Sequence, residues 1–196
     1  MVAGGGGSKD AAVLAWQKQV ELDTKEKRCP ELKVLKSTER GEEKPKIQPM
    51  CDSVKSLIAA SDQYVAKAKP GDDKAPPIAY KAAELFYVHN QFDEARKRFK
   101  AVISSYPKTE VAKYAANLTV ETYLIDKNWV AVEQVTAELF ANKDVIDPKS
   151  DLARDLQKFK LGSRFKLAED LMAKGDYDQA AKKYLELVAA KPDHEF

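Results

Sequence analysis

Small, large apolar and proline positions recur in this chain with one fixed spacing. The intervals between them are 3, 6, 3, 4 and 8 residues, and the second copy begins 85 residues after the first. The two copies are Ala83, Phe86, Phe92, Ala95, Phe99 and Pro107, and Ala168, Leu171, Tyr177, Ala180, Tyr184 and Pro192. Small residues let two helices approach closely, large apolar residues fill the space between them, and proline ends the second helix. The pattern therefore predicts antiparallel helix pairs.

Apolar residues at helical spacing predict further helices along the chain. The expected helices span residues 10–28, 51–69, 76–88, 92–105, 109–126, 129–141 and 147–173, and a last helix runs from residue 177 towards Pro192. Residues 30–50, rich in Pro, Lys and Glu, predict a long loop with a short helical piece at 31–38. Asn128 and Asp176 are the expected N-caps of two helices, and Asp147 before a proline is the expected start of the long one.

This layout resembles the tetratricopeptide repeat (TPR), in which two antiparallel helices form each repeat. The resemblance implies an all-α fold: an α-solenoid of about eight helices in antiparallel pairs, forming a degenerate TPR superhelix. The repeat is degenerate because its aromatic turn residues Phe92, Trp129 and Tyr177 are 37 and 48 residues apart. A regular TPR recurs about every 34 residues.

The expected organisation has three parts. Residues 1–9 form a flexible leader, residues 10–75 an N-terminal helical pair with a long loop, and residues 76–196 the TPR-like repeats. The repeats are expected at 76–107, 109–141 and 150–192. Solenoids usually end in a polar capping helix, and the sequence shows none after its last repeat, so we expect a fragment of a longer repeat protein.

Two segments resemble a narrower group. Residues 106–115, Tyr-Pro-Lys-Thr-Glu-Val-Ala-Lys-Tyr-Ala, and residues 175–180, Gly-Asp-Tyr-Asp-Gln-Ala, are similar to segments of bacterial cell-envelope TPR proteins. That group includes outer-membrane assembly lipoproteins and periplasmic division-coordination proteins. Residues 80–87, 92–99 and 115–118 resemble the large TPR proteins of gliding-motility machines. The resemblance implies a periplasmic scaffold for other proteins.

The chain also departs from the family pattern. The tryptophan that is usual early in the first helix of a repeat is replaced by Ala79 and by Arg164, and Val132 stands where the second helix usually has alanine. Residues 1–75 resemble no family.

Charge and hydropathy narrow the possible partners. The net charge is +2, which predicts no strong field for nucleic acid or a membrane surface. The basic cluster of residues 96–100 is expected to be a solvated helix face, with a phosphate-binding patch as the alternative. No segment is apolar enough to span a membrane, and no signal peptide opens the chain. The native targeting signal is therefore expected to be missing.

Few residues are candidates for catalysis or for metal binding. His89 and His194 are the only histidines, and neither has a second ligand at metal spacing, so a surface or capping role is expected for both. No catalytic motif or phosphate loop is present. We therefore predict no enzyme activity, no cofactor and no metal. Cys29 and Cys51 flank the long loop, and a disulfide between them would stabilise the fold by about 3 kcal/mol. The alternative is two free thiols.

The first helix of each TPR lines the inner, concave face, which is where TPR proteins contact partners. Alignment of the repeats predicts partner-binding residues there: Tyr80, Glu84, Tyr87, Asn117, Glu121, Phe165, Glu169 and Met172. Two alternatives remain open. Phe165 and Met172 could only pack on a neighbouring helix, and the carboxylates could be no more than solvated helix surface.

The sequence thus favours a non-enzymatic protein-protein interaction scaffold of a bacterial envelope complex, located in the periplasm. The alternative is a regulatory or sensor TPR domain of a larger enzyme or signalling protein. The disulfide suits the first hypothesis, because such bonds persist in oxidising compartments.

Overall fold

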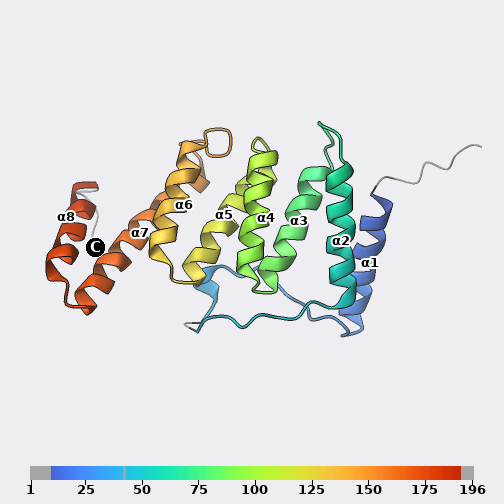
Figure 1. The fold of residues 1–196 in the computed structure, drawn as a ribbon, viewed down its shortest axis with the longest axis horizontal. Helices are drawn as coiled ribbons and strands as arrows, with labels where there is room; N and C mark the ends of the chain where they lie inside the picture. Colours follow the sequence, from blue (N-terminus) through green and yellow to red (C-terminus); the bar gives the residue numbers. More distant parts are fainter. Residues whose placement is uncertain (1–9, 42, 191–196) are drawn as a thin grey trace, which may run out of the picture. The chain divides into compact units, whose positions relative to one another are not determined.

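A computed structural model of the chain describes residues 10–41 and 43–190. This part of the chain contains eight α-helices, one short 3₁₀ helix and no strand (Figure 1). The helices are α1 (Ala11–Lys25), α2 (Asp52–Lys67), α3 (Ala75–Val88), α4 (Phe92–Ser105), α5 (Glu110–Ile125), α6 (Trp129–Ala141), α7 (Asp151–Ala173) and α8 (Tyr177–Ala190). The all-α fold predicted from the sequence is confirmed. The expected leader and His194 lie outside the described residues.

Contacts within the chain divide it into two compact units, residues 1–115 and 116–196. We call them unit 1 and unit 2. The boundary between the two units lies inside α5. The sequence instead suggests a division between residues 75 and 76, and that division stays a prediction. Unit 1 holds α1 to α4 and both cysteines, and unit 2 holds α6 to α8.

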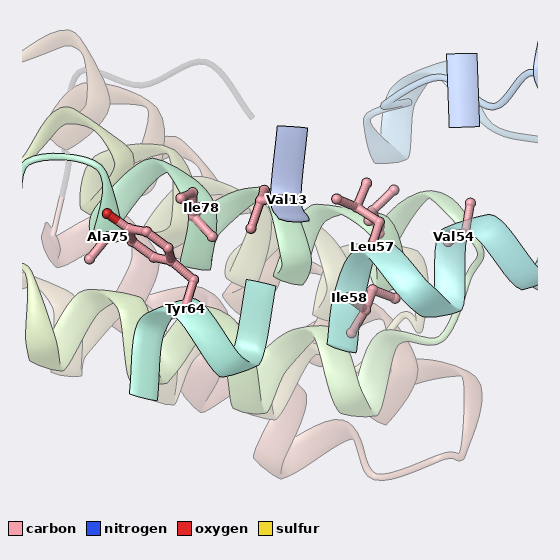
Figure 2. Packing of buried hydrophobic residues seen from close by; sticks show 8 residues of the cluster. Val13, Val54, Leu57, Ile58, Tyr64, Ala75 and Ile78 are labelled. Carbon is pink, nitrogen blue, oxygen red and sulfur yellow. The ribbon is translucent and has the colours of Figure 1, made fainter. Parts of the chain in front are cut away.

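The repeated small residues have the role that the pattern predicts. Ala83, Ala95, Ala168 and Ala180 are all completely buried, and α3 packs against α4 as α7 packs against α8. Another core cluster joins α1, α2 and α3 in unit 1 (Figure 2). Its side chains are Val13, Val54, Leu57, Ile58, Tyr64, Ala75, Ile78 and Leu85.

Four helices end in the same backbone turn. A residue with positive φ follows each helix: Lys27, Asn90, Lys127 or Gly175. The next amide donates a hydrogen bond of 2.7–3.0 Å to the carbonyl five residues earlier, as Gln91 does to Phe86. This pairing satisfies carbonyls at the helix end. In three of the four turns an aromatic residue then opens the next helix, namely Phe92, Trp129 or Tyr177.

In the first of these turns the aromatic position is occupied by Cys29. The chain then leaves the repeat pattern for residues 30–50, which we call the strap, and α2 begins just after Cys51. A disulfide joins Cys29 to Cys51 with their Cα atoms 5.6 Å apart, as predicted. Helices α1 and α2 pack together. They therefore form a helix pair whose connecting turn carries an insertion closed by a disulfide.

Helix boundaries correct two expectations. The long helix begins at Asp151, because Ser150 rather than Asp147 is its N-cap: Ser150 Oγ accepts a hydrogen bond from the Ala153 amide at 3.1 Å. The strap is helical only over Ser37–Glu39. Asn128 is confirmed as the N-cap of α6, since its side chain accepts from the Ala131 amide. Asp176 accepts from the Gln179 amide at the start of α8.

Asp23 connects the end of α1 to the disulfide through hydrogen bonds. Its carboxylate accepts hydrogen bonds from the side chains of Ser53, Arg28 and Gln19, and its carbonyl accepts from the Cys29 amide at 3.1 Å. Ser53 Oγ in turn lies 3.4 Å from Cys29 Sγ. These donors favour the charged carboxylate and lower the pKa of Asp23 from 3.8 to about 2.

This depressed pKa predicts an acid-sensitive contribution to stability. A carboxylate with a lower pKa in the folded state stabilises the protein above its unfolded pKa of about 4, and that stability is lost as pH falls from there through about 2. We expect Asp23→Asn to lower the urea midpoint at pH 7 and the difference from wild type to shrink towards pH 2.5. Asp155→Asn, an exposed change on α7, is the control. A difference that stays constant with pH would refute the Asp23 assignment.

Candidate functional site

The strap lies across the turn between α3 and α4. Tyr87 Oη donates a hydrogen bond of 2.6 Å to the Leu35 carbonyl. Asn90 accepts from Arg40 at 2.9 Å and donates to the Lys46 carbonyl at 2.8 Å. The Gln48 amide donates to the His89 carbonyl at 2.9 Å. Residues far apart in the sequence therefore fix the strap to the second helix pair of unit 1.

Arg40 also covers the aromatic residues at this turn. Its guanidinium lies 5.5 Å from the Tyr87 ring centre and 5.6 Å from that of Phe92, within the range of cation–π attraction. The two rings contact each other as well, with centres 5.7 Å apart. The strap thus shields both rings from solvent.

A groove of about 530 Å³ opens beside the strap in unit 1. Helices α1 and α3 form its sides, α2 contributes Val54 and Leu57, and Cys29 with the first residues of the strap, up to Val34, supplies the remaining wall. The apolar lining residues are Val20, Leu32, Val34, Val54, Leu57, Leu85 and Val88, and the charged ones are Glu21, Glu31, Lys81 and Glu84. A largely apolar concavity with a few polar groups is the usual form of a ligand site.

A pair of tyrosines adjoins the groove at Glu84. Tyr80 lies one helical turn before Glu84 on α3 and donates a hydrogen bond to its carboxylate, and its ring centre is 6.2 Å from that of Tyr114 on α5. Tyr114 is 57% exposed. Burial, followed by the nearby Glu84 carboxylate, raises the pKa of Tyr80. We call Tyr80 and Tyr114 the aromatic shelf.

Two of the three partner-binding residues expected on α3 are accessible. Tyr80 belongs to the shelf, and Glu84 lines the groove, where it forms an ion pair with Lys81. Tyr87 is fully buried, so its expected exposure is wrong. The reason is the strap, which covers a position that would face outward in an ordinary repeat. His89 is buried too and caps α3, with Nδ1 2.6 Å from the Leu85 carbonyl.

The partner-binding residues expected in unit 2 also differ in their exposure to solvent. Glu121 is 2% exposed, so it is not an accessible contact residue. It belongs to a run of five consecutive buried residues, 118–122, and such a run surrounds a helix rather than lying on one face. Asn117 is half-buried, and Met172 is 45% exposed. A binding role for the accessible residues stays a prediction.

The remaining two residues of unit 2 have partners within the chain. Phe165 packs edge-on against Tyr184, with ring centres 5.7 Å apart. Glu169 accepts from Lys166 at 2.6 Å. Both interactions match the packing and surface roles that the sequence leaves open as alternatives.

The basic cluster on α4 is engaged with its neighbours. Arg98 donates two hydrogen bonds to Asp62, at 2.7 and 3.0 Å, and lies 4.6 Å from the centre of the Phe86 ring. Arg98 on α4 is thus linked to Asp62 on α2 and to Phe86 on α3. Among the described residues there is no cluster of three or more potential metal-binding side chains, and no helix there has the length and apolar character needed to cross a membrane.

Sequence reasoning missed the groove and the role of the strap in it. A groove wall made by residues 29–34 depends on contacts such as Arg40 to Asn90, which are 50 residues apart. One local signal exists: Cys29 occupies the place of the aromatic residue that follows the other three helix-ending turns. Because Cys29 stands where the other turns have the first residue of the next helix, its position indicates that residues 30–50 are an insertion in a helix pair.

Comparison with known proteins supports the repeat assignment. A family model described as the tetratricopeptide repeat matches residues 79–109, which include α4, most of α3 and the α3 wall of the groove. The chain therefore contains a TPR, and its fold is an all-α, TPR-like solenoid. No curated protein and no solved structure matches the chain. TPRs generally mediate protein–protein interaction and are typically not enzymes.

Proposed function

We propose that the chain is a non-enzymatic scaffold of a bacterial cell-envelope complex and that it holds partner proteins through unit 1. The observation that carries this proposal is the groove beside the aromatic shelf. Helix α3 contributes to both, through Lys81, Glu84, Leu85 and Val88 in the groove and Tyr80 in the shelf, and these residues lie inside the segment that matches the TPR model. The half-buried Tyr80 and the exposed Tyr114 near an apolar groove are suited to protein contact, because Tyr is enriched among residues that dominate binding energies.

Two observations support the envelope location. The Cys29–Cys51 disulfide suits an oxidising compartment such as the periplasm. Residues 106–115 and 175–180 resemble segments of envelope TPR proteins. Gliding-motility and outer-membrane assembly machines are the complexes that this resemblance suggests.

Affinity capture from an envelope extract of the source organism tests the scaffold function. We expect the oxidised chain to retain specific proteins and the Tyr80→Ala/Tyr114→Ala variant to bind them more than tenfold more weakly, because losing one tyrosine hot spot typically costs about 2 kcal/mol. Circular dichroism first verifies that the variant is helical. Lys97→Ala/Lys100→Ala, on the exposed face of α4, is the matched control and should bind as wild type does.

Two results would contradict the proposal in different ways. If wild type retains nothing beyond the bare resin, the scaffold function is wrong. If the tyrosine variant retains the same partners equally well, the aromatic shelf is not the contact surface.

A further inference from the structure

We infer that the groove of unit 1 binds a short segment of a partner protein in which a Lys or Arg lies next to a large apolar side chain. This inference rests on the proposed scaffold function and adds the chemistry of the partner. It depends on the shape of the groove, its apolar lining and its charge.

The apolar lining leaves room for one or more partner side chains. The groove volume of about 530 Å³ lies within the range of ligand sites, roughly 300–1,000 Å³. Val20, Leu32 and Val88 are only half-buried, and Val34 is 40% exposed. A partner that covers these side chains removes apolar surface from water, which contributes about 25 cal/mol per Å².

The charges around the groove favour a cation. Three carboxylates line it, Glu21, Glu31 and Glu84, against the single ammonium of Lys81. Lys81 is already paired with Glu84, so the groove carries two further negative charges in a chain whose net charge is +2. Within the described part of the chain, neither Glu21 nor Glu31 has an ion-pair partner. A Lys or Arg from the partner would supply that counter-charge.

The groove also offers hydrogen bonds to a peptide backbone. Gln17 lines it from α1, and its carboxamide has no hydrogen-bond partner among the described residues. An amide side chain both donates and accepts, so Gln17 can pair with a main-chain N–H or C=O of the bound segment. A partner protein with an accessible segment therefore fits the groove better than a lipid or a small anion does.

Peptide selection tests the partner chemistry without knowledge of the native partner. Random dodecapeptides are selected against the full oxidised chain, and individual hits are measured by fluorescence anisotropy. We expect enriched peptides to combine Lys or Arg with Leu, Ile, Val or Phe. Their affinity should fall severalfold between low and high salt, because ions screen charge pairs at the rim of the groove.

Matched variants locate the binding. Glu21→Gln/Glu31→Gln should weaken these peptides about tenfold, as expected from two partly exposed ion pairs, and should reduce the salt dependence. Val34→Arg should abolish binding, since it fills the groove and adds positive charge. Asp93→Asn/Glu110→Gln removes two carboxylates outside the groove and should change affinity less than twofold.

The inference is overturned if selection yields no binders, if the enriched peptides lack cations, or if Glu21→Gln/Glu31→Gln binds as wild type does. It is also overturned if the chain self-associates and Val34→Arg makes it monomeric, because the occupant is then a second copy. If the affinity capture above still retains partners in any of these cases, the scaffold function stands and only the groove assignment falls. If that capture also fails, both are wrong.

Discussion

Replacing Phe99 by alanine is expected to lower the free energy of unfolding by about 3–5 kcal/mol. Phe99 is completely buried, and its ring centre is 5.9 Å from that of Tyr80 and 6.4 Å from that of Tyr87. Truncation removes apolar contact and leaves a cavity between α3 and α4. Tyr80 belongs to the aromatic shelf, and Tyr87 holds the strap through its hydrogen bond to Leu35. Loss of the Phe99 ring would therefore also disturb the candidate site.

The two tryptophans allow the measurement to be confined to unit 1. Trp16 lies on α1 and Trp129 on α6. In a Trp129→Phe background, the fluorescence of Trp16 follows urea unfolding of unit 1 alone. Leu22→Ala removes a large side chain that is exposed on α1, also in unit 1, and is the control, with an expected change within about 0.5 kcal/mol. A similarly small effect of Phe99→Ala would contradict the packing described here.

Removing the disulfide is expected to cost about 3 kcal/mol. The bond closes a loop with a sequence separation of 22. Without the bond the unfolded chain has higher conformational entropy, which favours unfolding. Cys29→Ser/Cys51→Ser should therefore unfold at lower urea than the oxidised wild type. Its affinity for the selected peptides should fall too, because Cys29 and residues 30–34 form one wall of the groove.

Reduced wild-type protein is the matched control for the serine variant. Both should show the same loss of stability if the bond itself is the cause. Mass spectrometry under non-reducing conditions checks that the bond forms in protein made under oxidising conditions. Two freely alkylated cysteines in that sample, or equal stability of the oxidised and reduced chains, would contradict the role given to the strap.

The sequence predicted the helices because their signals are local and repeated. Ala95 and Ala180 hold equivalent places in two helix pairs and are both fully buried, so one spacing was enough to locate α3, α4, α7 and α8. The start of α7 was misplaced because Asp147 and Ser150 are both good N-caps. Only the structure shows that Ser150 caps the helix while Asp147 accepts from the Lys149 amide one turn earlier.

The candidate site was predictable only in part because it depends on long-range packing. Repeat position alone predicted that Tyr80 and Glu84 are accessible on α3, and both are partly exposed there; their role in binding stays a prediction. Tyr87 was misassigned because its burial comes from Leu35 and Arg40 of the strap, which no repeat pattern contains. Glu21 and Glu31 were not identified, because nothing local distinguishes them from other surface carboxylates.

Site-specific photo-crosslinking tests most directly whether partners bind in the groove of unit 1. Lys33, an exposed residue between the groove-lining Leu32 and Val34, or Lys100 on the exposed face of α4 as the control, is replaced by p-benzoylphenylalanine in the full oxidised chain. The partner recovered by affinity capture should form an adduct from position 33 and not from position 100, and an excess of a selected Lys-containing peptide should suppress it. Adducts from position 100 alone, or from position 33 without competition by the peptide, would show that partners bind elsewhere.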